Sequence, residues 1–411
     1  MLRKNLKYNL KNNYIIKASS LSLILQVLAV IIGFYLIKVQ LNYFGLKTYG
    51  IWVSSLSVFN VILIFDPGRA NALRNYIITH GIKQSGFVFL NTFKYYLKIS
   101  LLLILIFSIY HAYNISFNKD LTLSIILLAV PFLFFTKLIN SILLGIHKPY
   151  YIYTINIISL SLQFLLWNFF SVFINSTYAI ISIHVFIPVI INFIAFIFIY
   201  TKFENFELID LNNFKIEGIN FFISQLLLVV FAYGNLWFVY IFNSKINNDF
   251  GLIYKLFLVV YGLIMSMLSP FWSYYRKLIT ENNIKYLVRT FKLTIYGSII
   301  FSIIWIVILI NLNTILNLFK FNFVNETDFL SIGLYFLSII LFQTCYVYLN
   351  GKGLNNLIRN KFLSILILIS ITQIIFQFYF DLNKSFYCQT TIIFTTTIYY
   401  VINIFKQLKV F

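Results

Sequence analysis

Two lysines lie inside long apolar stretches, where an ammonium group needs water or a partner. Lys137 stands in PFLFFTKLINSILLG, about eight residues before that stretch ends, and Asn140 follows on the same helical face. Lys255 stands in FGLIYKLF, about five residues into another apolar stretch. A lysine at the bilayer centre costs about 2.5–3.5 kcal/mol on insertion scales. Both lysines are therefore candidates for lining a cationic cavity that binds an anionic ligand.

Each of these residues also has a structural interpretation. Lys137 would either contact a diphosphate or acidic sugar, or form a fixed pair with a carboxylate or a helix C-terminus. Lys255 would either face the cavity or extend its ammonium to the outer membrane surface. Tyr254 beside it would either stack on a sugar ring or pack in the core. Small residues share the helical stripe of Lys255, as on a helix face that contacts protein: Gly251, Gly262, Ser266 and Ser269.

Charge is also concentrated in DPGRANALRN, directly after the 17 uncharged residues YGIWVSSLSVFNVILIF. In one interpretation Asp66 is the N-cap of a new helix, with Pro67 in its first turn, and Arg69 and Arg74 anchor that helix to lipid phosphates at the cytoplasmic surface. In the other, Asp66 pairs with an arginine as a gate that opens during transport, or binds a proton. The residue types allow both interpretations.

Patterns for chemistry on a substrate are missing from the sequence. There is no Walker loop, no carboxylate pair and no Ser-His-Asp set, and the four histidines and two cysteines have no zinc spacing. We therefore predict no catalytic residue, no metal site, no cofactor and no enzyme activity. A membrane oligosaccharide polymerase or ligase is a weaker alternative, because the longest expected outer loop, about residues 313–327, is short and poor in charge.

The solvent expected around most of the chain is a lipid bilayer. Of its 411 residues, 61% are hydrophobic and only 10% are charged, whereas soluble domains carry about 25% charged residues. Mean hydropathy is +0.88. These values predict an all-α integral membrane protein with about 12 spans. The expected spans are 18–41, 48–66, 93–111, 121–145, 150–174, 178–200, 219–242, 250–272, 292–312, 328–349, 362–381 and 385–405.

Basic residues predict the orientation. The net charge is +20, and the lysines and arginines fall between the apolar stretches. With a cytoplasmic N-terminus, the inner segments hold 23 of them and the outer segments hold 6. The positive-inside rule then places both termini in the cytoplasm. The same distribution argues against nucleic acid as a partner.

The two halves of the sequence repeat. Phe44-Gly45 and Phe250-Gly251 are 206 residues apart, and so are Gly145 and Gly351. We predict two six-helix bundles, residues 1–210 and 211–411, with the same orientation in the membrane. Transporters built from such repeats place their substrate between the halves.

Three stretches resemble Wzx-type polysaccharide flippases: NYFGLKTYGIW with DPGRANALRN, FGLIYKLF with LSPFWSYYRKLITENN, and YVYLNGKGLNNLIRNKF. The resemblance covers most of the chain. It implies the multidrug/oligosaccharidyl-lipid/polysaccharide exporter superfamily, whose MATE-like fold has two helical lobes around a central cavity.

The resemblance implies a function as well as a fold. Wzx-type proteins move undecaprenyl-diphosphate-linked oligosaccharides, of O-antigen, lipopolysaccharide or capsule type, from the inner to the outer leaflet of the bacterial cytoplasmic membrane. Alternating access driven by an ion gradient is expected. Membrane lipids and other polysaccharide assembly proteins are the further expected partners. The main alternative is a multidrug/cation antiporter of the same fold, which would need acidic residues at mid-span.

Overall fold

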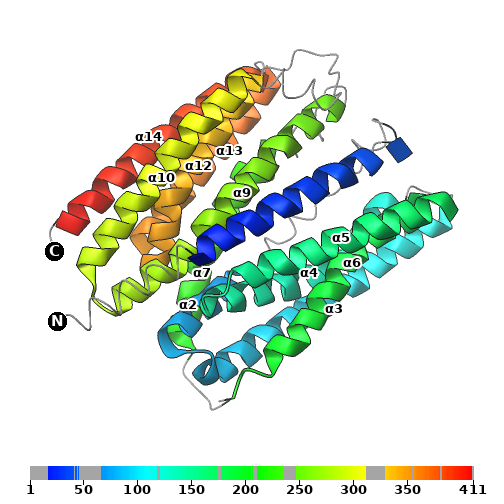
Figure 1. Cartoon of the computed structure of the whole chain (residues 1–411), viewed down its shortest axis with the longest axis horizontal. Helices are drawn as coiled ribbons and strands as arrows, with labels where there is room; N and C mark the ends of the chain where they lie inside the picture. The colour runs from blue at the N-terminus through cyan, green and yellow to red at the C-terminus, as the bar shows by residue number, and fades with distance from the viewer. Residues whose placement is uncertain are drawn as a thin grey trace. The chain divides into compact units, whose positions relative to one another are not determined.

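In the computed structural model the described residues are almost entirely helical (Figure 1). The described residues are 17–40, 42, 43, 45, 66–117, 121–173, 177–204, 206, 211–235, 247–311, 329–353, 356–379 and 382–409, and no strand occurs among them. The chain divides into two compact units, Met1–Gln225 and Leu226–Phe411. Apart from Asp66, the expected span 48–66 lies outside the described residues.

The first unit is built around one central helix, α4 (Thr122–Gly145). Its apolar stretch is 61% buried, against 17% for that of α3. Helices α2, α3, α5 and α6 all contact α4. The unit contains the helix Lys17–Gln40, α2 (Arg69–His80), the 3-10 turn η2 (Lys83–Ser85), α3 (Gly86–Ser116), α4, α5 (Tyr150–Phe173), α6 (Thr177–Tyr200) and α7 (Asn212–Val229) as far as Gln225.

The second unit has the same plan, with α12 (Phe329–Lys352) at its centre. The apolar stretch of α12 is 78% buried, and α9, α10 and α14 contact it. The unit continues α7 through a π-helix, η3 (Val230–Gly234), and contains α9 (Asn247–Thr280), α10 (Ile284–Ile310), α12, α13 (Asn356–Tyr379) and α14 (Leu382–Lys409).

The two glycines at matched positions, Gly145 and Gly351, each lie where a neighbouring helix packs closely. A side chain at Gly145, the last residue of α4, would meet Ile77 of α2 at 3.1 Å. A side chain at Gly351, near the end of α12, would meet Tyr275 of α9 at 2.7 Å. Each central helix therefore needs a glycine where a neighbouring helix crosses its end.

Ten helices among the described residues are long and apolar enough to cross a membrane. One face of α3 shows why they need lipid: Leu101, Leu105 and Ile109 follow each other by four residues and are 58–64% exposed. Several helices are longer than the apolar stretches that predict them. α9, for example, has 34 residues because its helix continues beyond the apolar stretch at both ends. The protein is a multi-pass all-α membrane protein, as predicted.

Candidate functional site

The candidate site begins at a non-helical turn, residues 66–68, which directly precedes α2 and is called the break. Pro67 cannot donate a backbone hydrogen bond, and Gly68 takes a left-handed conformation, with φ of 74°. Helix α2 therefore starts at Arg69, whose backbone N–H donates to Asp66 Oδ1 at 3.0 Å. Asp66 thus satisfies the first turn of α2, although Gly68, and not Asp66, is the N-cap residue.

Contact with α7 fixes this break. A Cβ atom at Gly68 would lie 2.1 Å from the carbonyl oxygen of Gly218 and 2.7 Å from Cβ of Phe221. Nearby, the side chain of Asn75 donates to Glu217 Oε1 at 2.8 Å. The start of α2 and the N-terminal half of α7 therefore lie against each other with no room for a side chain at residue 68.

Asp66 is completely buried, and each of its carboxylate oxygens has a strong partner. The hydroxyl of Tyr96, on α3, donates to Oδ1 at 2.8 Å. The ammonium of Lys137, on α4, lies 2.7 Å from Oδ2. A short charge-assisted contact of this kind compensates for removing the carboxylate from water.

Lys137, on α4, connects the break to α7. Its Nζ also donates to Oε1 of Gln225, on α7, at 2.6 Å. The Lys137 side chain is 22% exposed, whereas that of Asp66 has no exposure. Lys137 lies eight residues before the end of α4, which corresponds to about 12 Å along the helix. An ammonium therefore lies within a membrane span, held by a carboxylate and an amide and still partly accessible.

The two arginines of DPGRANALRN have different surroundings. The guanidinium of Arg69 stacks on the ring of Tyr95, with its carbon 3.8 Å from the ring centre, and donates to Asn91 at 3.3 Å. Arg74 is only 2% exposed. The anchoring of Arg69 and Arg74 to lipid phosphate stays a prediction, and the burial of Arg74 does not favour it for that residue.

The remaining predicted residues fall in three different environments. Asn140 is half-buried on α4, one turn beyond Lys137. Tyr254 is completely buried, its ring packs against Phe336, and its hydroxyl donates to the Phe231 carbonyl oxygen at 3.3 Å. Of the two interpretations of Tyr254, this environment corresponds to core packing and not to sugar stacking. Lys255 lies in α9, but its side chain lies outside the described residues.

Two members of the network were not predicted from the sequence. Tyr96 is one of 30 tyrosines, and nothing in its local pattern separates it from the others. Gln225 is a polar residue inside the seventh span, and polarity at that depth was the available signal. Both residues are recognised only when α3 and α7 are placed beside the Asp66 break.

The second unit has no equivalent charge at the position matched to Lys137. Gln343 stands eight residues before Gly351, as Lys137 stands eight before Gly145. Its amide donates to the hydroxyl of Tyr261 at 2.8 Å. At this matched position the first unit therefore has an ion pair and the second unit has a neutral hydrogen bond.

Comparison with solved structures finds the same fold in other proteins. A multidrug resistance MATE family transporter in an outward-facing conformation and a MOP superfamily transporter from Pyrococcus furiosus each match with a TM-score of 0.67 at 12% identity, over 96% of both chains. A MATE in a bent conformation matches with a TM-score of 0.66 at 13% identity, over 97% of this chain and 96% of that one. The chain therefore has the MATE fold.

Two comparisons by sequence found no match. No family model matches the chain, and no curated protein matches it.

Proposed function

We propose that the protein is a flippase that moves lipid-linked oligosaccharides across the bacterial cytoplasmic membrane by alternating access. The cargo class is an undecaprenyl-diphosphate-linked glycan, carried from the inner to the outer leaflet. The observation that carries the proposal is Lys137, a partly exposed ammonium within a membrane span. The MATE fold and the three stretches that resemble Wzx-type flippases support it.

The chemistry of the cargo suits a cation at this depth. A diphosphate must leave the headgroup region to cross the membrane, and an ammonium in a low-dielectric environment attracts it far more strongly than one in water. The polyprenyl tail is as apolar as the lipid chains and needs no site of its own. In the proposed mechanism Lys137 contacts the diphosphate, and Asn140 hydrogen-bonds to the adjoining sugar.

In the proposed mechanism, the Asp66–Lys137 ion pair is the state of the site without cargo. Without cargo, the Asp66 carboxylate compensates the charge of Lys137. A diphosphate that binds Lys137 would displace this carboxylate, which would then be buried without its cation, a costly arrangement. A coupled cation beside Asp66 would remove that cost. Exchange of partners at Lys137 thus offers a route by which an ion gradient drives the cycle.

A multidrug or cation antiporter is the second candidate, and one observation favours it. Asp66 is a completely buried carboxylate, a group that can exchange a proton for a cationic drug. In that function Asp66 would bind the cargo and Lys137 would only compensate its charge. The two candidates therefore assign opposite roles to the same pair.

Single substitutions in a strain lacking the gene distinguish the candidates. We expect Lys137→Ala to reduce the surface glycan at least tenfold and to accumulate lipid-linked intermediates on the inner leaflet. Lys137→Arg is expected to retain part of the export because it keeps the charge. Lys255→Ala, tested alongside, is expected to reduce export as well.

The matched control is Lys98→Ala, which removes an exposed lysine of α3 and is expected to leave export unchanged. Protein in the membrane fraction is measured for every variant. Normal export by Lys137→Ala would end the flippase proposal. Loss of resistance to cationic drugs in Asp66→Asn, with normal glycan export, would establish the antiporter instead.

A further inference from the structure

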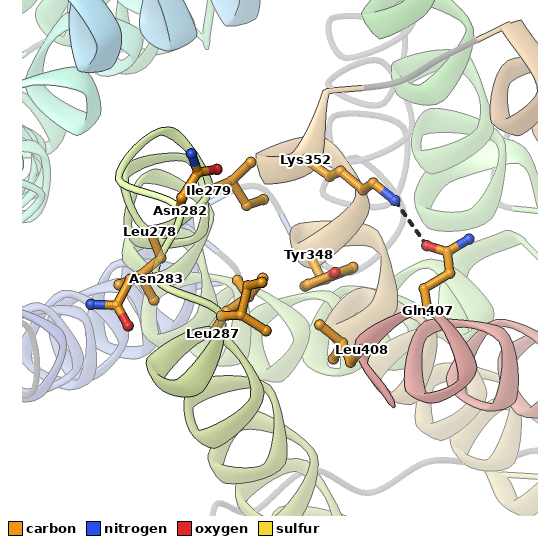
Figure 2. A pocket seen from close by; sticks show the side chains of 10 residues that line it. Leu278, Ile279, Asn282, Asn283, Leu287, Tyr348, Lys352, Gln407 and Leu408 are labelled. Atoms are coloured by element: carbon orange, nitrogen blue, oxygen red, sulfur yellow. Dashed lines mark hydrogen bonds between the residues drawn. The ribbon is translucent and has the colours of Figure 1, made fainter. Parts of the chain in front are cut away.

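A second site is visible in the second unit, where four helices end or begin. A pocket of about 170 Å³ lies between the turn that joins α9 to α10 and the ends of α12 and α14. Figure 2 shows Leu287, Leu408 and the ring of Tyr348 between that turn and the pair formed by Lys352 and Gln407. The pocket therefore has an apolar floor and a polar rim.

The position of this pocket corresponds to the boundary between lipid chains and headgroups. Each surrounding helix contains a candidate span that ends or begins here: Phe257–Thr280, Ile284–Val307, Leu330–Lys352 and Ser385–Leu408. The hydrocarbon core gives way to polar headgroups within a few ångströms of such helix ends. A ligand in the pocket would thus contact acyl chains on one side and water on the other.

Lys352 gives the rim a positive charge. Its ammonium donates to Gln407 Oε1 at 2.9 Å, and an amide oxygen leaves the charge uncompensated. Among the described residues, Lys352 has no carboxylate partner. Glu281, the acidic residue of the α9–α10 turn, is exposed and does not line the pocket. The rim can therefore accept an anion.

Helix α10 adds to this preference. It begins at Ile284, a lining residue, so the positive end of its dipole lies beside the pocket, with the Tyr286 N–H already donating to the Asn283 side chain at 3.4 Å. The flanking segments are also basic, with five lysines and arginines in residues 273–292, three in 350–361 and two after residue 405. Such enrichment at one membrane surface attracts anionic lipids.

We propose that this pocket binds the headgroup of an anionic phospholipid. The phosphate lies between Lys352 and the first turn of α10, and the glycerol and upper acyl chain lie along Leu287, Leu408 and Tyr348. The apolar floor favours a lipid over free phosphate, and the volume suits a headgroup and not a whole lipid. The site is separate from the Asp66–Lys137 network and does not depend on the cargo.

Native mass spectrometry of the full-length protein in detergent tests this inference. The protein is titrated with phosphatidylglycerol or phosphatidylcholine of identical acyl chains. We expect preferential retention of phosphatidylglycerol, and a loss of about fivefold in Lys352→Gln, as expected for one lysine near a membrane surface. Asn282→Asp is expected to weaken retention too, because it adds a negative charge to the rim while its left-handed φ of 51° tolerates aspartate.

Lys361→Gln is the matched control, because Lys361 is a lysine near the start of α13 that contacts the Tyr399 hydroxyl and does not line the pocket. Thermal unfolding in the same detergent confirms that each variant is folded. Equal retention of the two lipids by the wild type would overturn the proposal. Equal losses in Lys352→Gln and Lys361→Gln would overturn it as well, as would complete displacement of phosphatidylglycerol by millimolar inorganic phosphate.

Discussion

At the scale of single residues, one contact relates two unusual features of the sequence. Lys137 is a cation within an apolar span, and Asp66 is the carboxylate that ends a long uncharged run. The structure places their charged atoms 2.7 Å apart. Each group therefore supplies the partner that the other requires, and Tyr96 and Gln225 supply the remaining hydrogen bonds.

Removing one member of this pair should cost more than removing both. We expect Asp66→Asn and Lys137→Gln each to destabilise the protein by about 2–4 kcal/mol, because each leaves a charge without its partner in the interior. The double variant should be more stable than either single variant. Thermal unfolding midpoints of purified protein in one detergent provide the comparison.

The exposed pair of Lys83 and Glu204 is the control for this cycle. Their charged atoms are 2.6 Å apart, but the two side chains are 70% and 58% exposed. Glu204→Gln should change the midpoint little, since exposed pairs contribute about 0–1 kcal/mol. Simple additivity of the two substitutions in the buried pair would show that the charges do not depend on each other.

The sequence identified both members of the pair but not the pairing itself. The pattern of apolar residues shows which charged residues lie within or beside a membrane span, but it does not show which helices are neighbours. Asp66 lies in the turn before α2 and Lys137 lies in α4, so their contact depends on how α2 and α4 pack. The sequence left Tyr254 open between sugar stacking and core packing for the same reason: only packing shows that Phe336 lies against its ring.

At the scale of helices, the break at Pro67 and Gly68 separates α2 from the chain before it. A proline alone does not produce such a break, because α9 continues through Pro270. The combination of proline with a left-handed glycine keeps residues 66–68 out of helix and sets the start of α2 at Arg69. The break then allows Asp66 to turn its carboxylate toward α3 and α4.

Replacing Gly68 should disturb this arrangement more than replacing another left-handed glycine. Gly68→Ala adds a Cβ atom 2.1 Å from the Gly218 carbonyl oxygen, so α2 and α7 must separate. Gly81 also has a positive φ, 85°, but its ψ is 158°, and a Cβ atom at this residue would meet nothing within 4 Å. We expect Gly81→Ala to cost about 1–3 kcal/mol from backbone strain alone, and Gly68→Ala to cost clearly more.

Thermal unfolding midpoints and glycan export are measured for both glycine variants and compared. Similar losses in the two would mean that backbone conformation, and not the contact with α7, determines the effect.

Most helices of this fold were predictable, because span length follows from the thickness of a bilayer. The helix ends were not predictable, because the backbone hydrogen bonds of a helix can continue beyond the apolar stretch. α3 thus covers Gly86–Ser116, whereas the apolar pattern marks residues 93–111. The start of α2 also differs by a few residues, since Gly68 caps the helix in place of Asp66.

At the scale of the whole molecule, orientation in the membrane is the prediction to test first. In a variant with Cys345→Ala and Cys388→Ala, single cysteines are introduced and intact cells are treated with a membrane-impermeant maleimide. We expect labelling of Lys119→Cys and Lys384→Cys, because the positive-inside rule places both outside. Lys202→Cys and Lys361→Cys should react only after permeabilisation. The reverse pattern would place both termini outside the cytoplasm.

The Asp66–Lys137 pair also bears on the electrical work of transport. Moving one elementary charge through a membrane potential of 100 mV involves about 2.3 kcal/mol. An ammonium and a carboxylate held 2.7 Å apart cancel each other, so helices that carry them together move no net charge through that field. While the pair stays closed, the voltage dependence of turnover would report only the charge of the cargo and of any coupled ion.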